Sequence, residues 1–159
     1  MTFLTLITFH QNLNELFIRH QEALLDGDIE AATDRLDEFI KQLREHMDYE
    51  EKHLLPVYQR AGEIRGGAVE FFTGEHRKML ELLARIQDSL NLFATNPENL
   101  KRRIIKLFDE EAAFKSLVEH HDMREENILY PTLDRITTPE EKKYLLNDCL
   151  HRQAAHQSL

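Results

Sequence analysis

The sequence predicts an all-α protein, an antiparallel up-down four-helix bundle with a short C-terminal helix. Three observations support this fold class. The chain of 159 residues has only 5 Gly and 4 Pro, and 31% of its residues are charged, which is typical of helix-forming sequences. Turn-forming residues divide the chain into segments of similar length, and apolar residues recur within each segment at steps of three and four. We expect residues 1–136 to form one domain with a single core, and residues 137–159 to form a short helix and a tail.

Three turn signals separate the four long helices. The first is Asp26-Gly27-Asp28, where a glycine can adopt a positive φ between residues that favour turns or helix caps. The second is residues 61–67 with three glycines, and the third is residues 95–99 with an Asn-Pro step. A fifth helix is predicted to begin at Thr138-Pro139-Glu140-Glu141, which offers a capping hydroxyl, a proline at the first helical position and a glutamate three residues after the cap.

The apolar face of every long helix is interrupted by ionisable side chains. Burying such a group without a partner costs roughly 1–3 kcal/mol or more, so these groups are expected to share a ligand or a hydrogen-bond network. The interrupting residues are His10, His20, His46, Glu50, His53, His76, Glu111, His121 and Glu125.

Four of the histidines are predicted to lie at one level of the bundle. In antiparallel neighbouring helices, residues equidistant from the connecting turn lie side by side. The midpoints between successive members of the series His10, His46, His76 and His121 all fall in or beside the predicted turns. Pairing His20 with His46 would instead place a turn inside the second helix, so His10 is the better candidate.

Two glutamates have the spacing that places them beside these histidines. Glu50 follows His46 by four residues and Glu125 follows His121 by four, so each pair shares one helix face. The surrounding segments also match, HMDYEEKHLLP with HDMREENILYP, and HQNLNELF after His10 matches HRKMLELL after His76. The chain therefore reads as two related helical hairpins, and a twofold pseudo-symmetric site suits two metal ions.

This arrangement resembles the hemerythrin-like, or HHE cation-binding, domains, over Phe3 to about Ile136. The resemblance implies two iron ions with an oxo or hydroxo bridge, with manganese or zinc as alternative metals. It makes the two glutamates bridging ligands and the four histidines terminal ones, and the metal ligands it implies are His10, His46, Glu50, His76, His121 and Glu125. Oxygen-carrying hemerythrins have a further His where this chain has Leu80 and an Asp where it has Glu126. The pattern is closer to bacterial hemerythrin-like proteins linked to iron, oxygen or nitric oxide handling.

Counting donors indicates what such a site can bind. Four imidazoles, two bridging carboxylates and one oxo or hydroxo bridge leave about two positions open of roughly twelve on two six-coordinate ions. A small diatomic ligand or peroxide is therefore the expected partner, and a binding or sensing module is favoured over an enzyme. A ferroxidase or peroxidase, an iron–sulfur repair or nitrosative-stress protein, and a metal-free scaffold remain as alternatives. Ferritin-like di-iron enzymes typically use two Glu-x-x-His pairs, whereas Glu50-x-x-His53 occurs here once.

The other polar core residues have simpler interpretations. We expect His20 to be a hydrogen-bonded core residue, and we leave open whether His53 is a further ligand. Glu111 has no partner that the sequence identifies, while Glu51 and Glu126 are expected to be solvated neighbours of the ligands.

Charge and cysteine content limit the partners and the compartment. The net charge of −9 would repel nucleic acid and anionic membranes, so neither is expected as a partner. The single Cys149 cannot form an internal disulfide, and the N-terminus lacks the features of a secretory signal. A cytoplasmic location is the default expectation, and the oligomeric state is left open.

Overall fold

The computed structural model describes residues 1–157, and the side chains of residues 1–152. Its elements, in chain order, are η1 (Phe3–Leu6), α1 (Ile7–Leu25), α2 (Ile29–Tyr49), η2 (Glu50–Leu54), α3 (Leu55–Tyr58), η3 (Gln59–Ala61), α4 (Val69–Thr95), α5 (Leu100–Arg124), η4 (Glu125–Leu129), α6 (Tyr130–Ile136) and α7 (Pro139–Gln157). Because α2 continues through η2, α3 and η3, and α5 through η4 and α6, the chain forms four long helices and α7. The predicted all-α fold class is confirmed.

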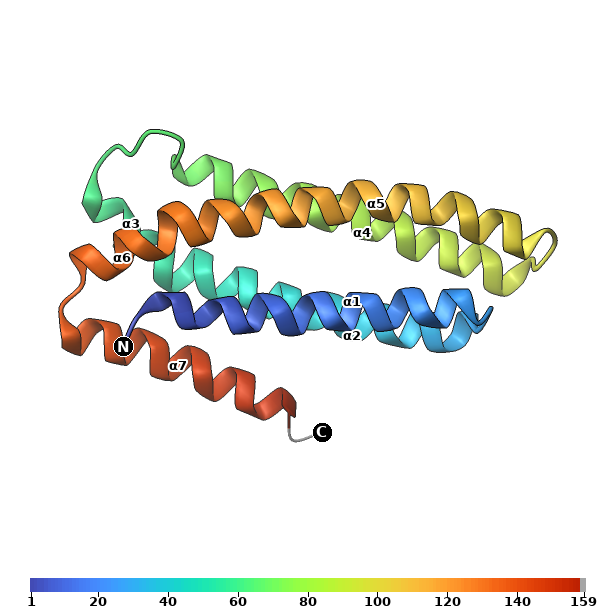
Figure 1. Cartoon of the computed structure of the whole chain (residues 1–159), viewed down its shortest axis with the longest axis horizontal. Helices are drawn as coiled ribbons and strands as arrows, with labels where there is room; N and C mark the ends of the chain where they lie inside the picture. Colours follow the sequence, from blue (N-terminus) through green and yellow to red (C-terminus); the bar gives the residue numbers. More distant parts are fainter. Residues whose placement is uncertain (158–159) are drawn as a thin grey trace.

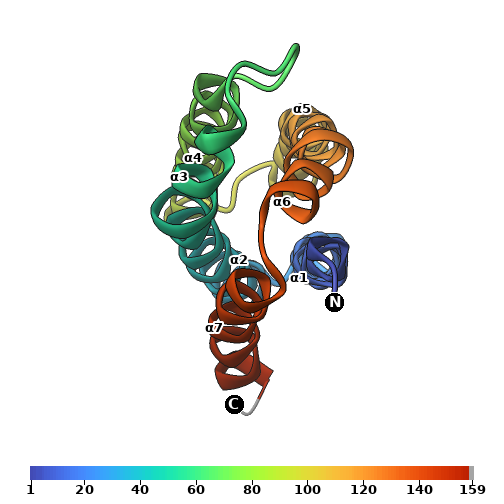
Figure 2. The same ribbon diagram turned by 90° about the vertical axis from the view of Figure 1, so that its left-hand side faces the viewer.

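The four long helices form two antiparallel hairpins that lie side by side. The hairpin of α1 and α2 lies along the hairpin of α4 and α5 (Figure 1), and α7 lies outside the bundle, beside α2 (Figure 2). Leu145, Leu146 and Cys149 of α7 are buried against residues of η1, η2, α3 and α6. The Tyr49 hydroxyl donates a hydrogen bond to the backbone carbonyl of Leu145. None of the helices in the described part of the chain has the length and apolar character needed to cross a membrane.

The turns form at the predicted places. Gly27, between α1 and α2, has a φ of 69°, and the Asp28 side chain caps α2 by accepting a hydrogen bond from the Ala31 amide at 3.0 Å. The predicted capping box at the start of α7 is also present: the Glu141 amide donates to Thr138 Oγ1 at 3.2 Å, and the Thr138 amide donates to Glu141 Oε2 at 3.0 Å. The helix that begins there continues to Gln157, so it occupies most of the segment for which a short helix and a tail are expected. Residues 158–159 lie outside the described residues.

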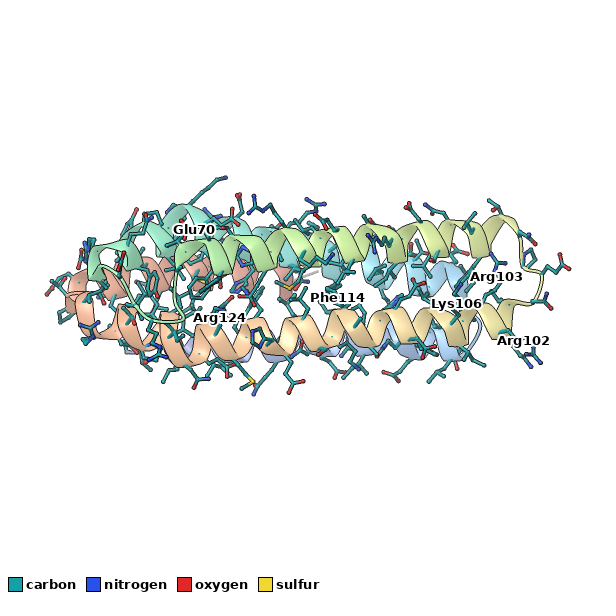
Figure 3. All side chains as sticks on the ribbon, turned by 90° about the horizontal axis from the view of Figure 1, so that it is seen from above. Glu70, Arg102, Arg103, Lys106, Phe114 and Arg124 are labelled. Carbon is teal, nitrogen blue, oxygen red and sulfur yellow. The ribbon has the colours of Figure 1, made fainter. Side chains whose placement is uncertain are left out.

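The bundle interior consists of two apolar clusters. The larger includes Phe17, Phe39 and Phe114, whose ring centroids lie 5.1–5.9 Å apart, and Figure 3 shows Phe114 between α4 and α5. The smaller lies toward the N-terminus and α7 and includes Phe3 and Phe72. Along each long helix, the candidate ligands fall where one cluster gives way to the other.

Both candidate bridging glutamates begin a π-helical turn, η2 at Glu50 and η4 at Glu125. In each turn the backbone amide five residues later, of Leu55 or Tyr130, donates to the glutamate carbonyl. A proline follows each glutamate by six residues, Pro56 and Pro131. Proline cannot donate a backbone hydrogen bond, and its ring crowds the carbonyl four residues earlier, which lies inside the π turn in both cases. The wider turn accommodates this disruption, and such turns are frequent at functional sites.

His20 is a hydrogen-bonded core residue, as the sequence predicts. Its Nδ1 donates to the Ala32 carbonyl at 2.8 Å, and its Nε2 lies 3.0 Å from Glu111 Oε2. Both side chains are fully buried. The partner of Glu111, which the sequence did not identify, is therefore His20.

The His20–Glu111 pair generates a prediction about stability. His20→Ala should lower the free energy of unfolding by about 3 kcal/mol, because it leaves the Glu111 carboxylate buried without its partner. Urea unfolding followed by circular dichroism measures the loss. A variant with both His20→Leu and Glu111→Leu should lose less, since apolar residues of similar size can replace a buried pair. A loss of roughly 0.5 kcal/mol or less in His20→Ala, the range of ordinary surface substitutions, would contradict this account.

Candidate metal centre

The six candidate ligands lie together in the core, at the junction of the two apolar clusters. One comes from each of six elements: His10 from α1, His46 from α2, Glu50 from η2, His76 from α4, His121 from α5 and Glu125 from η4. All six are buried, and Glu125 is fully inaccessible to solvent. Five of them, all but Glu50, line a cavity of about 20 Å³, which is room for about one water molecule.

Each glutamate joins histidines from both hairpins. Glu50 Oε1 lies 2.7 Å from His46 Nε2, and Glu50 Oε2 lies 3.2 Å from His76 Nε2. Glu125 Oε2 lies 3.1 Å from His10 Nε2, and its Oε1 contacts His121 Nε2. The donor atoms form two groups of four, each within a span of 4.8 Å, and both groups include Glu50 and Glu125. The first group adds His10 and His46, and the second adds His76 and His121.

The polar atoms of these six residues do not satisfy one another's hydrogen bonds, and their arrangement suits a bound cation. Among the described residues, His46 Nε2, Glu50 Oε2 and Glu125 Oε1 are buried without a hydrogen bond, although charged neighbours are close. The Nε2 atoms of His76 and His121 lie 3.2 Å apart, a contact in which one ring nitrogen must donate to the other. Imidazole and carboxylate donors converging in this way suit iron, manganese or zinc.

The buried carboxylates hold protons on His10 and His121 when no cation is present. Burial alone lowers the pKa of His10, but the Glu125 carboxylate and its neighbours outweigh burial and raise that pKa to about 9. The pKa of His121 is raised well above its usual value against the same burial effect, again mainly by Glu125. Burial raises the pKa of Glu125, and the facing His121 and His10 reverse that shift and hold it well below its usual range. In the metal-free centre, His10 and His121 are therefore imidazolium groups beside the Glu125 carboxylate.

Carboxylates also lie behind three of the histidines, near Nδ1. Glu51 Oε1 lies 2.9 Å from His76 Nδ1, and Glu75 Oε1 lies 3.8 Å from His121 Nδ1. His10 Nδ1 lies 3.7 Å from Asp122 Oδ1 and 3.6 Å from Glu126 Oε1. Such outer carboxylates orient a ligating imidazole and raise its basicity.

The outer carboxylates extend one expectation. Glu51 and Glu126 are solvated neighbours of the ligands, as expected, with 42% and 32% of their side chains exposed, and each also faces a candidate ligand of another helix. The repeated Glu-Glu step, at Glu50-Glu51 and at Glu125-Glu126, is the sequence signal that could have revealed them. Asp122 and Glu75 carried no such signal, because their contacts depend on how the helices pack.

Tyr130 is a further member of the centre that the sequence did not identify. Its hydroxyl donates to Glu125 Oε2 at 2.6 Å, and it lies 3.1 Å from His10 Nε2. Burial and the nearby Glu125 and Glu50 carboxylates raise the pKa of Tyr130 well above its usual value, so the phenol is neutral. The first hairpin has Leu55 at the matching position, which is why the repeated motif did not single Tyr130 out.

His53 does not join either group of donors. Its ring lies against Tyr49, with the centroids 5.2 Å apart. The π turn that begins at Glu50 shifts the following residues from the positions that a regular α-helix would give them. The structure therefore gives His53 no place among the candidate ligands.

Comparison with protein families agrees with this geometry. The model of the hemerythrin HHE cation binding domain matches residues 3–133. The chain belongs to the hemerythrin HHE cation-binding domain family. The resemblance stated from the sequence is thus confirmed, and the HHE family assignment and the buried His and Glu side chains together indicate a cation site. No curated protein and no solved structure matched the chain in the corresponding comparisons.

The common level of the ligands predicts which substitutions abolish cation uptake by this HHE domain. His46→Ala and His121→Ala should each reduce bound metal to near zero, since each removes one donor and leaves a buried carboxylate facing a gap. His20→Ala is the matched control, because it removes a buried histidine that belongs to neither donor group. Metal analysis of the folded, desalted proteins measures the outcome. Equal loss of metal in all three variants would contradict the ligand assignment.

The raised pKa of His10 predicts that metal affinity increases with pH. In the metal-free chain His10 is protonated below pH about 9, and an imidazolium must lose its proton before it can act as a ligand. The apparent association constant should therefore rise about tenfold per pH unit for each proton released, as the pH rises toward about 9. Competition with a chelator of known affinity, under anaerobic conditions, measures the slope.

The same shift has the opposite effect on the metal-free fold. A raised pKa of His10 contributes stability that is fully present below pH 6.5 and is lost as the pH rises through about 9. Metal affinity that does not change with pH over this interval would show that no imidazolium is displaced.

Proposed function

We propose that this chain is a non-haem di-iron protein that binds or senses a small diatomic ligand or oxidant, such as dioxygen, nitric oxide or peroxide. The observation that carries the proposal is the pair of four-residue donor groups that share Glu50 and Glu125. His10 and His46 would hold one ion, His76 and His121 would hold the other, and the two glutamates would bridge them. Iron is the metal typical of the family, and manganese and zinc are the alternatives.

Two ferrous ions held by these residues would supply open coordination positions and reducing electrons to a ligand. The protein's own contribution is enclosure and orientation. Apolar clusters lie on both sides of the donors, and Leu13, Leu43 and Met79 line the small cavity at the centre together with five of the six donors. This enclosure supports a diatomic ligand or peroxide over an organic substrate. Glu51, Asp122 and Glu126 would keep the imidazoles behind which they lie in a fixed orientation.

An oxidative enzyme of the ferroxidase or peroxidase kind is the second candidate, and Tyr130 is the observation that favours it. A neutral phenol that already donates to Glu125 at 2.6 Å is placed to deliver a proton to a reduced oxygen species. Repeated consumption of peroxide, or of ferrous iron with dioxygen, would mark the enzyme. Uptake of one ligand per centre without turnover would mark the binding module, and repair of iron–sulfur clusters under nitrosative stress would also require turnover.

The proposal predicts two iron ions per chain when the metal-free protein is loaded with ferrous iron without oxygen. Colorimetric iron analysis and the optical spectrum before and after adding nitric oxide measure the stoichiometry and ligand binding. The variant with both Glu50→Gln and Glu125→Gln keeps the size of both side chains but removes the bridging carboxylates, so it should bind little iron. A wild-type stoichiometry near zero would contradict the proposal, and a value near one would contradict the di-iron form of it.

Iron that binds in the core should also stabilise the fold. A free ligand concentration about a hundredfold above Kd contributes roughly 2.7 kcal/mol. For a chain of this size that raises Tm by several degrees, at roughly 2–4 °C per kcal/mol. Thermal unfolding with and without iron, and after a chelator, tests this, with the double glutamine variant as the control. An unchanged Tm in protein shown to be loaded would mean that the ions bind outside the core.

A further inference from the structure

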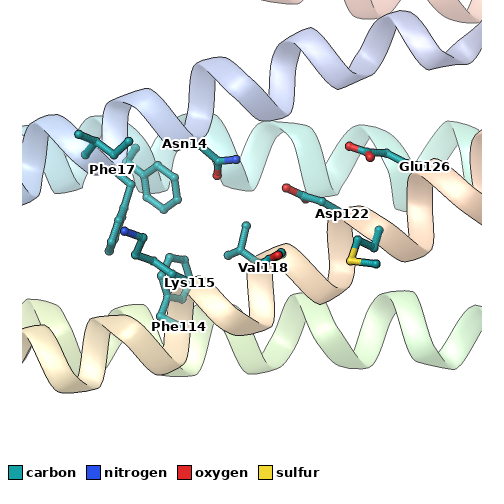
Figure 4. A pocket seen from close by; sticks show the side chains of 11 residues that line it. Asn14, Phe17, Phe114, Lys115, Val118, Asp122 and Glu126 are labelled. Atoms are coloured by element: carbon teal, nitrogen blue, oxygen red, sulfur yellow. The ribbon is translucent and has the colours of Figure 1, made fainter.

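A groove opens between α1 and α5 beside the candidate metal centre. Its volume is about 380 Å³, and it is lined by Asn14, Phe17, Ile18, Phe39, Phe114, Lys115, Val118, Glu119, Asp122, Met123 and Glu126. Asn14 and Asp122 also line the small cavity at the centre. These two side chains therefore lie between the groove and the donors. Figure 4 shows Asp122 toward the same end of the groove as Glu126, and Asn14 between Asp122 and Phe17.

The end of the groove nearest the centre is acidic. Asp122 and Glu126 line it, Glu119 also lines the groove, and the one lysine or arginine among the lining residues is Lys115. Figure 4 shows Lys115 at the opposite end, beside Phe17, where its ammonium lies 3.2 Å from Gln21 Oε1. The basic residues at the start of α5, Arg102, Arg103 and Lys106, lie at the far end of the bundle (Figure 3). A cleft lined by one sign of charge attracts ions of the other sign and speeds their association.

His10 connects this acidic end to the centre. The residue is 4% exposed, and its Nδ1 has no hydrogen bond among the residues that the structure describes. That nitrogen lies 3.7 Å from Asp122 Oδ1 and 3.6 Å from Glu126 Oε1, while Nε2 faces Glu125. Carboxylate and imidazole groups therefore form an unbroken series of possible metal ligands from the groove to the six candidate ligands.

The other sides of the centre differ from the groove side. Behind His121, the Glu75 carboxylate is already paired with Arg124 at 2.7 Å, a cation that would repel an entering cation. The related positions between α2 and α4 carry different side chains. In the sequence repeat, Leu80 stands at the position of Asn14, Arg44 at that of Glu119 and Met47 at that of Asp122. Met47 is buried in the larger apolar cluster, and Leu80 packs against that cluster. The repeat thus gives an acidic, polar side between α1 and α5, whereas the side between α2 and α4 combines apolar residues with Arg44 and with Glu51, whose carboxylate is paired with His76 Nδ1 at 2.9 Å.

We propose that the groove between α1 and α5 is the entry route of the metal cation, taken here as ferrous iron. This inference rests on the proposed function. Glu119 and Glu126 attract the hydrated ion, and the groove has room for it with several water molecules. The amide oxygen of Asn14 and the carboxylate of Asp122 replace water ligands as the ion passes into the cavity at the centre, which takes about one water-sized molecule.

A steric variant and a charge variant test the route through the rate of loading. Metal-free wild type, Val118→Trp and Glu119→Gln are mixed with ferrous iron in an anaerobic stopped-flow instrument, and bound iron is measured at the end. Neither residue is a candidate ligand. Val118→Trp fills the groove and should slow loading about tenfold, which corresponds to an added barrier of about 1.4 kcal/mol, with the final iron content unchanged. Glu119→Gln should also slow loading, by a factor that shrinks as salt is added.

Glu110→Gln is the matched control, because Glu110 is an exposed residue of the same helix outside the groove lining. It removes the same charge and should leave the loading rate unchanged. Glu119→Gln decides the matter if Val118→Trp fails to fold by circular dichroism. Wild-type rates in both groove variants, at full iron content, would overturn the entry route alone.

Two further outcomes separate the possible failures. A wild-type chain that takes up no iron would overturn both the route and the proposed function. Slower reaction of preloaded Val118→Trp with nitric oxide, together with unchanged iron loading, would assign the groove to neutral ligands and overturn the cation route.

Discussion

The burial of two carboxylates in one small cavity is the constraint on which the centre depends. Glu50 and Glu125 are 1% and 0% exposed, and two like charges without water would be strongly unfavourable. The facing imidazoles compensate for them, since the pKa values of His10 and His121 are raised beside Glu125, and the pKa of His76 is raised beside Glu50. A divalent cation bound by the same imidazole nitrogens and carboxylate oxygens would supply positive charge in place of these protons. Protons and metal therefore compete for one set of donors, and metal binding, pH and stability are linked.

The His20–Glu111 pair shows how the same bundle buries an imidazole and a carboxyl group without a metal. There, one imidazole lies between one carboxylate and the Ala32 carbonyl, and both ring nitrogens have a partner. In the centre, four imidazoles meet two carboxylates, and several donor atoms are left without hydrogen bonds among the described residues. The difference lies in the geometry of the polar atoms, because both sites are fully buried in the same kind of apolar surroundings. Unsatisfied, converging donors distinguish a cation site from a structural ion pair.

Local patterns in the sequence were sufficient to predict the fold and to nominate the six donors. Turn residues, the capping box at Thr138 and the period of the apolar residues act over a few positions, and the antiparallel geometry then set the level of the histidines. The remaining features depend on contacts between distant segments. Glu111 meets His20 across 91 residues, and Tyr130 meets His10 across 120. The π turns were not predicted, because each depends both on a proline six residues after a glutamate and on the packing of that glutamate in the core.

The sequence repeat supplies a nearly symmetric set of donors, but the residues that differ between the hairpins make its two halves unequal. Tyr130 stands where the first hairpin has Leu55, Asp122 where it has Met47, and Arg124 where it has Tyr49. His10 consequently lies beside a phenol and two outer carboxylates, whereas the carboxylate behind His121 is paired with an arginine. Ions at the two positions would experience different fields, because hydrogen bonds and charges around the ligands tune a metal as much as the ligands do. The matched residues account for binding cations, and the unmatched ones give the centre a polar side on which hydrogen-bond donors and the groove are found together.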